Sequence, residues 1–491
     1  MNMHASLQGL EDPGNEIETR YSPIDGQTVT WSGRWASQHE VTKAVSLSQE
    51  AFPAWSRTTL EHRVECVQKF AMFLQAHRPE IAKSISLESG KPLWESDLEV
   101  SSAVAKVDLA IDALRKRRWN THERIGAAQS SVRFRPLGPM VVLGPYNLPL
   151  HLPGAHIVPA LLAGNTILFK PSEKSPAVGH WILRAWSACD LPHGVIQLVD
   201  GAVPQAKWLV GSPGIAGVLF TGSYAAGRQI HQQLAGRPEC MLALEMGGNN
   251  PLVVDRVKNR KAAIATIVQS AFITSGQRCT CARRLIVVKH SENAGLLEEL
   301  SRAIGRIHVG NPIAERQPFM GTLVSESAAQ SILSAQEQWR SKGGAVLQES
   351  RVIGDCPAML SPGLIHAATP IDDDQEHFGP LLLAMEVSDL DEAIALSHRT
   401  GYGLAAGLLS DDPSAYFHFV KEVRSGIINW NSPTTGASGK LPFGGIGFSG
   451  NHRPSGYFAA DYCSYPVASI ENHELSNPES LPPGLQELLG T

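Results

Sequence analysis

Short apolar runs alternate with helical runs along the middle of the chain, and few folds accommodate this alternation. Four runs, at residues 139–144, 165–170, 195–201 and 217–223, are predicted strands. Helical spacing of apolar residues separates some of them, at 155–164 and 177–189. Strands that are joined through helices pair in parallel, and helices then cover both faces of the sheet. The sequence therefore predicts an α/β fold.

A second α/β region follows, with predicted strands at 252–255 and 284–288 and predicted helices at 262–275 and 294–304. Residues 39–118 are predicted to be mostly helical, and one more short strand is predicted at 462–470. The chain has 491 residues, of which 43% are hydrophobic, so it has room for two or more domains around a large core. We expect the border between the two sheet regions near residues 246–248, where glycines interrupt the pattern.

Charge and cysteine content exclude several classes of protein. The chain carries 42 Lys and Arg against 47 Asp and Glu, a net charge of −5, which excludes a strongly basic nucleic-acid binder. Seven cysteines are too sparse for a disulfide scaffold, so we expect a reducing compartment, the cytoplasm. Residues 136–169 contain no charged side chain, but prolines interrupt them repeatedly, so we expect a buried core and no membrane span.

Cys279 lies in the segment SGQRCT (275–280), at the end of a predicted helix. A cysteine thiolate is the strongest side-chain nucleophile at neutral pH, especially near a helix end or a cation, and Arg278 precedes it. The alternative is a buried structural cysteine, which is the commoner role of a single cysteine. Cys281 stands two positions on, but no second Cys/His cluster has ligand spacing, so we expect no metal site.

Two polar residues close apolar strands. Glu245 ends the run MLALE before two glycines, and a partly desolvated carboxylate there would have the raised pKa of a general base. The alternative is a capping or surface glutamate. Asn147 follows a strand between Pro145 and Pro149, where its amide could donate to a developing oxyanion or serve only a turn.

Two further strand ends suit a dinucleotide. Lys170 and Glu173 follow a strand, and a carboxylate there could accept both hydroxyls of an adenosine ribose and repel a 2′-phosphate. The turn from Gly222 and Ser223 to Gly227 opens a helix with free amides for a pyrophosphate. It has the glycine spacing of a P-loop without the lysine, so it does not predict a P-loop. Each of these signals taken alone also fits an ordinary loop.

Seven segments follow one another in a fixed order: PYN, KPSE, FTGS, LEMGG, GQRC, EHFGP and PFGG. This combination resembles the aldehyde dehydrogenase superfamily and extends from about Tyr21 to Ile470. The resemblance implies a nucleophile, a general base and an oxyanion donor at Cys279, Glu245 and Asn147. It also implies NAD as the cofactor, contacted by Lys170, Glu173, Gly222, Ser223, Gly227, Glu376 and Phe378.

The same resemblance implies three structural parts. These are an NAD-binding domain (residues 1–118 and 139–246), a catalytic domain (247–447), and a small β oligomerisation arm with the tail (119–138 and 448–491). The first two would be Rossmann-like domains with parallel sheets. A homodimer or homotetramer is therefore expected, with a small aldehyde as the other partner and with neither nucleic acid nor membrane.

Three segments, HLPGAHIVPALLAGN, ALEMGGNNP and GQRCTCARR, narrow the resemblance to a branch of the family that oxidises a succinylated glutamate semialdehyde in arginine catabolism. Such an anionic substrate needs cations or amides in its pocket, and Arg278 and Lys440 are candidates. Another small polar or anionic aldehyde remains an alternative substrate. A cysteine hydrolase or acyltransferase remains a remote alternative, and it would need a histidine base beside Cys279.

Overall fold

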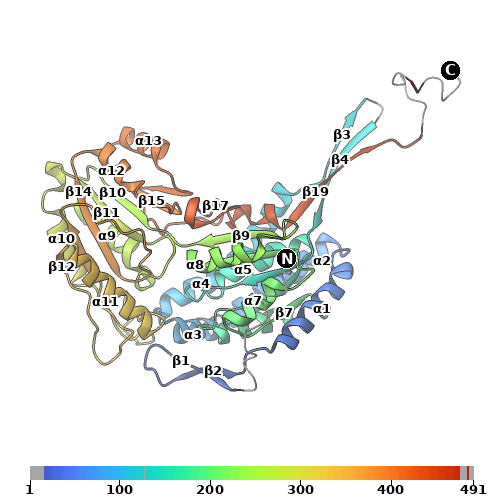
Figure 1. Ribbon diagram of the computed structural model, residues 1–491, viewed down its shortest axis with the longest axis horizontal. Helices are drawn as coiled ribbons and strands as arrows, with labels where there is room; N and C mark the ends of the chain where they lie inside the picture. Colours follow the sequence, from blue (N-terminus) through green and yellow to red (C-terminus); the bar gives the residue numbers. More distant parts are fainter. Residues whose placement is uncertain (1–15, 127, 476–483, 486–491) are drawn as a thin grey trace.

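The computed structural model describes residues 16–126, 128–475 and 484–485, and it contains two large sheets and a projecting arm (Figure 1). The first sheet has the order β7-β6-β5-β8-β9, and all of its neighbouring strands are parallel. Its strands are β5 (Pro139–Leu143), β6 (Thr166–Lys170), β7 (Ile196–Leu198), β8 (Gly217–Gly222) and β9 (Met241–Met246). The intervening helices are α5 (His151–Ala163), α6 (Pro176–Ser187), α7 (Val203–Gly211) and α8 (Tyr224–Leu234). The predicted α/β alternation is confirmed here.

Four helices and a hairpin precede this sheet. The hairpin pairs β1 (Glu18–Tyr21) with β2 (Val29–Gly33), and the helices are α1 (Gln38–Trp55), α2 (Leu60–Ala76), α3 (Arg78–Ser89) and α4 (Leu93–Arg117). Gly90 ends α3 with a φ of 74°, and a Cβ there would lie 1.9 Å from the Thr322 hydroxyl. This turn separates α3 from α4, and α4 then packs against α2, α3 and α5.

The second sheet has the order β12-β13-β14-β11-β10-β15-β16, and its neighbouring strands are parallel except for the antiparallel edge strand β12. The strands are β10 (Asn250–Val254), β11 (Ala282–Val288), β12 (Ala345–Gln348), β13 (Gly363–Ala367), β14 (Leu381–Val387), β15 (Ala405–Leu409) and β16 (Ile427–Trp430). The helices are α9 (Arg260–Phe272), α10 (Leu296–Ile304), α11 (Glu326–Ser341), α12 (Leu390–Ser397) and α13 (Pro413–Glu422). Strands β10, β11 and β15 are buried along their whole length, as parallel strands covered on both faces must be.

A three-stranded antiparallel arm extends away from both sheets (Figure 1). It consists of β3 (Thr121–Ile125), β4 (Ala128–Pro136) and β19 (Ser464–Glu471), in the order β19-β4-β3. The strand predicted at 462–470 is therefore confirmed, and Pro466 is tolerated because β19 lies at the edge of the arm. A short pair, β17 (Pro442–Phe443) and β18 (Ser455–Gly456), lies between the second sheet and the arm in sequence.

The charge-free stretch 136–169 forms β5, α5 and β6 in the core of the first sheet. Every residue of α5 after its first is buried. None of the described helices combines the length and the apolar character that a membrane span requires.

Candidate active site

One cavity of about 940 Å³ opens at the carboxyl ends of β5, β6, β8 and β9, where parallel sheets bind ligands. Most of the predicted site residues line it: Asn147, Lys170, Glu173, Gly222, Ser223, Glu245, Cys279, Glu376 and Phe378. Three predicted residues do not line it: Gly227, Arg278 and Lys440. Within the described part of the chain, no group of three or more His, Cys, Asp or Glu side chains could hold a metal ion.

The predicted candidates outside the cavity have other surroundings. Gly227 lies inside α8, where a Cβ would be 2.3 Å from the sulfur of Met246, so its small size allows α8 to approach β9. The Arg278 side chain pairs with Glu95 at 2.6 Å. Lys440 is exposed on the loop before β17. The structure thus does not bring either predicted substrate cation to the cavity wall.

The turn that carries Cys279 has a constrained backbone. After α9 the chain passes through Thr274 and Ser275, two non-glycine residues with φ values of 55° and 52°. Gly276 follows, and a Cβ there would lie 2.2 Å from a backbone oxygen of the neighbouring loop. The Asn250 amide then donates to the carbonyl of Cys279 at 2.7 Å. Such strained residues persist only where surrounding contacts fix them, so the position of the sulfur is well determined.

The Cys279 thiol is not made acidic by its surroundings. Its burial raises its pKa well above the ordinary value, and the charges of Glu245 and Glu376 raise it further. Arg278, the adjacent cation, is directed to Glu95 instead. The idea that a neighbouring arginine ionises this thiol is therefore wrong, and deprotonation requires a base in the cavity.

Glu245 ends β9 and meets the requirements for such a base. Its side chain is buried, the residue is 1% exposed, and both carboxylate oxygens lack a hydrogen-bond partner among the described residues. Burial raises its pKa to about 8; the neighbouring Cys279 thiol opposes this rise, and the nearby charge of Glu376 adds to it. A group that titrates near neutral pH can both accept and return a proton.

Glu376 and Phe378 close the cavity from the loop before β14. The Glu376 carboxylate accepts from the backbone N–H of Gly248 at 3.1 Å, and a Cβ on Gly247 would meet it at 1.8 Å. Burial raises the pKa of Glu376 to about 7. The Phe378 ring meets Tyr146 edge-on, with centroids 6.2 Å apart. A glycine at 247 therefore leaves room for Glu376, whereas a Cβ on Gly248 would meet the side chain of Asn250 at 2.4 Å.

Asn147 is fixed from two sides. Its side-chain amide donates to the carbonyl of Gln277 at 2.9 Å, which ties it to the turn that carries Cys279. The backbone carbonyl of Asn147 accepts from the Lys91 ammonium at 3.0 Å. A side-chain amide has two N–H donors, so one donor of Asn147 remains for a ligand.

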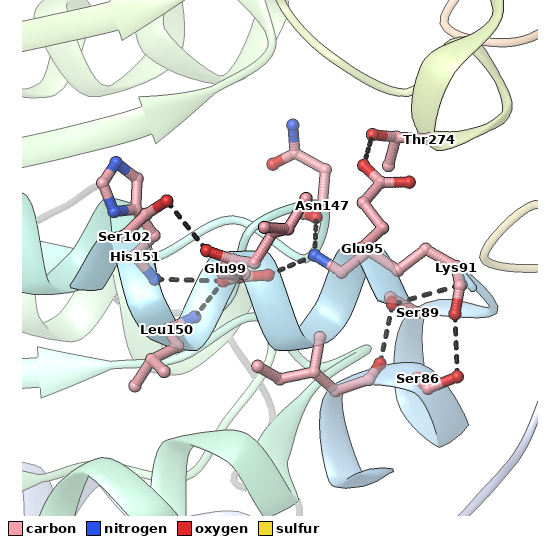
Figure 2. A network of polar contacts seen from close by, with 12 residues as sticks. Ser86, Ser89, Lys91, Glu95, Glu99, Ser102, Asn147, Leu150, His151 and Thr274 are labelled. Carbon is pink, nitrogen blue, oxygen red and sulfur yellow. Dashed lines mark hydrogen bonds and ion pairs between the residues drawn. The ribbon is translucent and has the colours of Figure 1, made fainter. Parts of the chain in front are cut away.

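Helix α4 carries the side chains that hold both the segment with Asn147 and the turn with Cys279 (Figure 2). Glu99 pairs with Lys91 and accepts from the backbone N–H groups of Leu150 and His151 at 2.9 and 3.0 Å. One turn earlier, Glu95 accepts from Thr274 and Arg278 in the cysteine turn. Sequence reasoning missed these residues, although two acidic positions four residues apart on the apolar face of one helix are an unusual pattern.

The cofactor end of the cavity lies between β6 and α8. The Lys170 ammonium donates to the carbonyl of Pro171 at 2.8 Å and lies 4.0 Å from the Glu173 carboxylate. Ser223 caps α8 by accepting from the backbone N–H of Ala226, so the helix begins at the cavity with its free amides. These groups suit a ribose and a phosphate.

The fold and this site together define a class of enzyme. A model of the aldehyde dehydrogenase family matches residues 11–466. The chain belongs to this family, and it is an aldehyde dehydrogenase that uses a nicotinamide cofactor.

Two curated relatives and one solved structure show which members of the family this chain is similar to. N-succinylglutamate 5-semialdehyde dehydrogenase of Chromobacterium violaceum is 45% identical over 96% of each chain. The protein of the same name from Chromohalobacter salexigens is 47% identical over 94% of each chain. The solved NADP-dependent glyceraldehyde-3-phosphate dehydrogenase of Bacillus halodurans C-125, complexed with NADP, has a TM-score of 0.87 at 26% identity and covers 95% of this chain and 98% of its own. The resemblance predicted within the family is thus confirmed.

Proposed function

We propose that the enzyme oxidises N-succinyl-L-glutamate 5-semialdehyde to N-succinyl-L-glutamate with NAD, through a thioester on Cys279, as a step of arginine catabolism. One observation carries the chemistry: the buried Glu245 carboxylate, whose oxygens have no hydrogen-bond partner within the described residues, shares a cavity with the Cys279 thiol and the Asn147 amide. The names of the two curated relatives support the substrate.

In the first step the Cys279 thiol gives its proton to Glu245, whose raised pKa suits this exchange. The sulfur then adds to the aldehyde carbon and forms a tetrahedral thiohemiacetal. The remaining amide hydrogen of Asn147 and the backbone N–H of Cys279 donate to its oxyanion. One such donor contributes about 10²–10³ in rate.

The cavity fits a dinucleotide in size and in chemistry. Its volume of about 940 Å³ lies at the upper end for ligand sites, and both Glu173 and Cys279 line it. A bound nicotinamide would supply the acceptor for the hydride that leaves the tetrahedral carbon, and a thioester on Cys279 would remain. Lys170 and Glu173 would bind the adenosine ribose, Gly222 and Ser223 the pyrophosphate, and Glu376 and Phe378 the nicotinamide ribose and ring. Glu173 would repel a 2′-phosphate, which favours NAD over NADP.

The second half of the reaction is a hydrolysis. Glu245 first releases the proton it took from the thiol to solvent, then removes a proton from water, and the resulting hydroxide attacks the thioester carbon. The bond between carbon and sulfur breaks, the substrate leaves as a carboxylate, and the Cys279 sulfur is free for another turnover. The same carboxylate thus serves both halves, which requires a pKa near the working pH.

The cysteine hydrolase alternative lacks its base. No histidine is among the residues that line the cavity in the described part of the chain.

We further propose that the arm of β3, β4 and β19 joins copies of the chain into a homodimer or homotetramer. Its exposed residue Ile470, at 65% exposure, would be covered in such an assembly.

The test is an NADH assay at 340 nm with N-succinylglutamate 5-semialdehyde, succinate semialdehyde, betaine aldehyde and aminobutyraldehyde. We expect the highest kcat/KM for the first substrate and none with Cys279→Ala, which should still bind NAD. A Cys279→Ala enzyme that still forms NADH would disprove the thioester. A higher kcat/KM for another aldehyde would disprove only the substrate.

A further inference from the structure

A buried arginine connects two segments of the cavity wall. Arg283 lies on β11 and is 2% exposed. Its Nη1 atom donates to the backbone carbonyl of Gly276 at 2.7 Å and to that of Gly379 at 3.2 Å. Its Nη2 atom donates to the carbonyl of Arg278 at 3.0 Å. One guanidinium thus ties the turn that carries Cys279 to the loop before β14.

The same guanidinium lies close to the two side chains of that loop that line the cavity, Glu376 and Phe378. Its Nη2 atom lies 3.9 Å from the Glu376 carboxylate, and its Cζ atom lies 5.4 Å from the centre of the Phe378 ring. A cation attracts both a carboxylate and the face of an aromatic ring. Burial raises the pKa of Glu376, and the charge of Arg283 is the larger of the two influences that oppose this rise. Arg283 therefore favours the ionised form of Glu376.

The next residue on β11 offers a comparison within the same strand. Arg284 is also buried, at 5% exposure, and it also donates to three backbone carbonyls, those of residues 249, 396 and 397. Because successive side chains of a strand point to opposite faces, the two arginines lie on opposite sides of the sheet. None of the three acceptor residues of Arg284 lines the cavity. The contacts of Arg283 with Glu376 and Phe378 are thus additional to what an anchoring arginine in this strand requires.

We propose that Arg283 is a positioning residue for the nicotinamide end of the cofactor and that it acts through Glu376 and Phe378. This inference rests on the proposed function, which assigns those two side chains to the nicotinamide ribose and ring. An ionised carboxylate has only acceptors, so it can accept from both hydroxyls of a ribose, whereas a protonated one has turned one oxygen into a donor. The bonds of Arg283 to both segments also hold this loop at a fixed separation from the turn that carries Cys279.

The test measures the binding of NAD and of ADP to the full-length enzyme by titration calorimetry. ADP has the adenosine and the pyrophosphate but no nicotinamide ribose, so it should not depend on Glu376 or Phe378. The quantity compared is Kd for NAD divided by Kd for ADP. We expect Arg283→Gln to raise this ratio about tenfold, because a protonated Glu376 makes one charge-assisted hydrogen bond fewer. Arg283→Lys should restore part of the ratio, since both new side chains donate to carbonyls but only lysine is charged.

Arg284→Gln is the matched control. It removes a buried guanidinium that has three carbonyl bonds, as Arg283 has, from the same strand. We expect it to lower Tm as Arg283→Gln does and to leave the ratio of the two Kd values unchanged. In NADH formation, Arg283→Gln should raise KM for NAD more than KM for the aldehyde.

Two results would overturn the positioning role of Arg283. One is an Arg283→Gln enzyme that binds ADP and NAD with an unchanged ratio, whatever its Tm. The other is an equal change of the ratio in Arg283→Gln and Arg284→Gln, which would assign the effect to the strand as a whole. A wild type that binds neither ligand would overturn the proposed use of NAD, and this role with it. A wild type that binds both but prefers another aldehyde would overturn the proposed substrate alone.

Discussion

Two buried glutamates on α4 and Glu245 in the cavity lie within one active-site region, and they have opposite surroundings. On α4, Glu95 and Glu99 each pair with a cation, Arg278 and Lys91. In the cavity, Glu245 has no partner on either oxygen among the described residues. Burial raises the pKa of Glu245 to about 8 and that of Glu376 to about 7.

The difference shows how one residue type serves two purposes at similar depth. A carboxylate that pairs with a cation and accepts from backbone N–H groups holds the backbone in place. A carboxylate that burial leaves unpaired is poised to gain or lose a proton. Burial alone therefore does not mark a candidate general base, and it is the missing partner that distinguishes Glu245, the base that we propose.

The largest effect is expected for Glu245→Gln. Because a glutamine cannot accept a proton, kcat should fall about 10²–10⁴-fold, as loss of a general base typically does. The assay is NADH formation under saturating substrate and NAD. A variant with the wild-type kcat would remove Glu245 from the mechanism.

The same variant should gain stability at high pH. The folded-state pKa of Glu245, about 8, exceeds its ordinary value of 4.5, so the stability it contributes below pH 4.5 is lost as pH rises through 8. Glutamine cannot undergo this loss. We expect Tm at pH 9 to exceed that of the wild type, with a smaller difference at pH 5, in thermal unfolding followed by fluorescence.

Glu99→Gln tests the ion pair between Glu99 and Lys91. It leaves the Lys91 ammonium buried without its counter-charge, which typically costs about 3–5 kcal/mol. It also weakens the hold on the segment that carries Asn147, so kcat should fall about 10–100-fold. The measurements are the urea midpoint and NADH formation.

The double variant Lys91→Met with Glu99→Gln is the control for this prediction. It removes both charges, so it should recover most of the lost stability while kcat stays low. A Glu99→Gln enzyme with full stability and full kcat would show that the α4 pair has no positioning role.

The order of strands and helices could be predicted because it depends on local periodicity. Predicted strands such as 139–144 and 217–223 are buried strands of one parallel sheet in the structure. The positions of Cys279 and Glu245 were marked by their segments, a turn after a helix and the end of an apolar strand. These signals are local, and a single sequence contains them.

The surroundings of these residues could not be predicted in the same way. Arg278 is adjacent to Cys279 in sequence, yet its partner is Glu95, which lies 183 residues away. Lys106 is one of many lysines in the sequence, and only the packing of α4 on α5 makes it a buried charge. Contacts of this kind depend on the tertiary fold, so neither periodicity nor neighbouring residues reveal them.

The pH profile is a further test of the unpaired Glu245 carboxylate. Glu245 must be ionised to act as a base, so kcat/KM should rise about tenfold per pH unit below pH 8 and level off above it. Assays from pH 6 to 9, at a saturating NAD concentration, would show this. A flat profile across that range would mean that Glu245 is already ionised at pH 6, which would contradict its raised pKa.

The smallest effect is expected for Glu173→Gln, which tests a carboxylate intermediate between the two kinds. Its side chain is 39% exposed and lies 4.0 Å from Lys170, so solvent partly screens its charge. Glutamine keeps hydrogen bonding to a ribose but no longer repels a 2′-phosphate. We expect the ratio of kcat/KM with NADP to that with NAD to rise several-fold. Glu239→Gln, which changes an exposed carboxylate outside the cavity, should leave the ratio unchanged. An equal ratio in both variants would mean that shape, rather than the charge at 173, selects the cofactor.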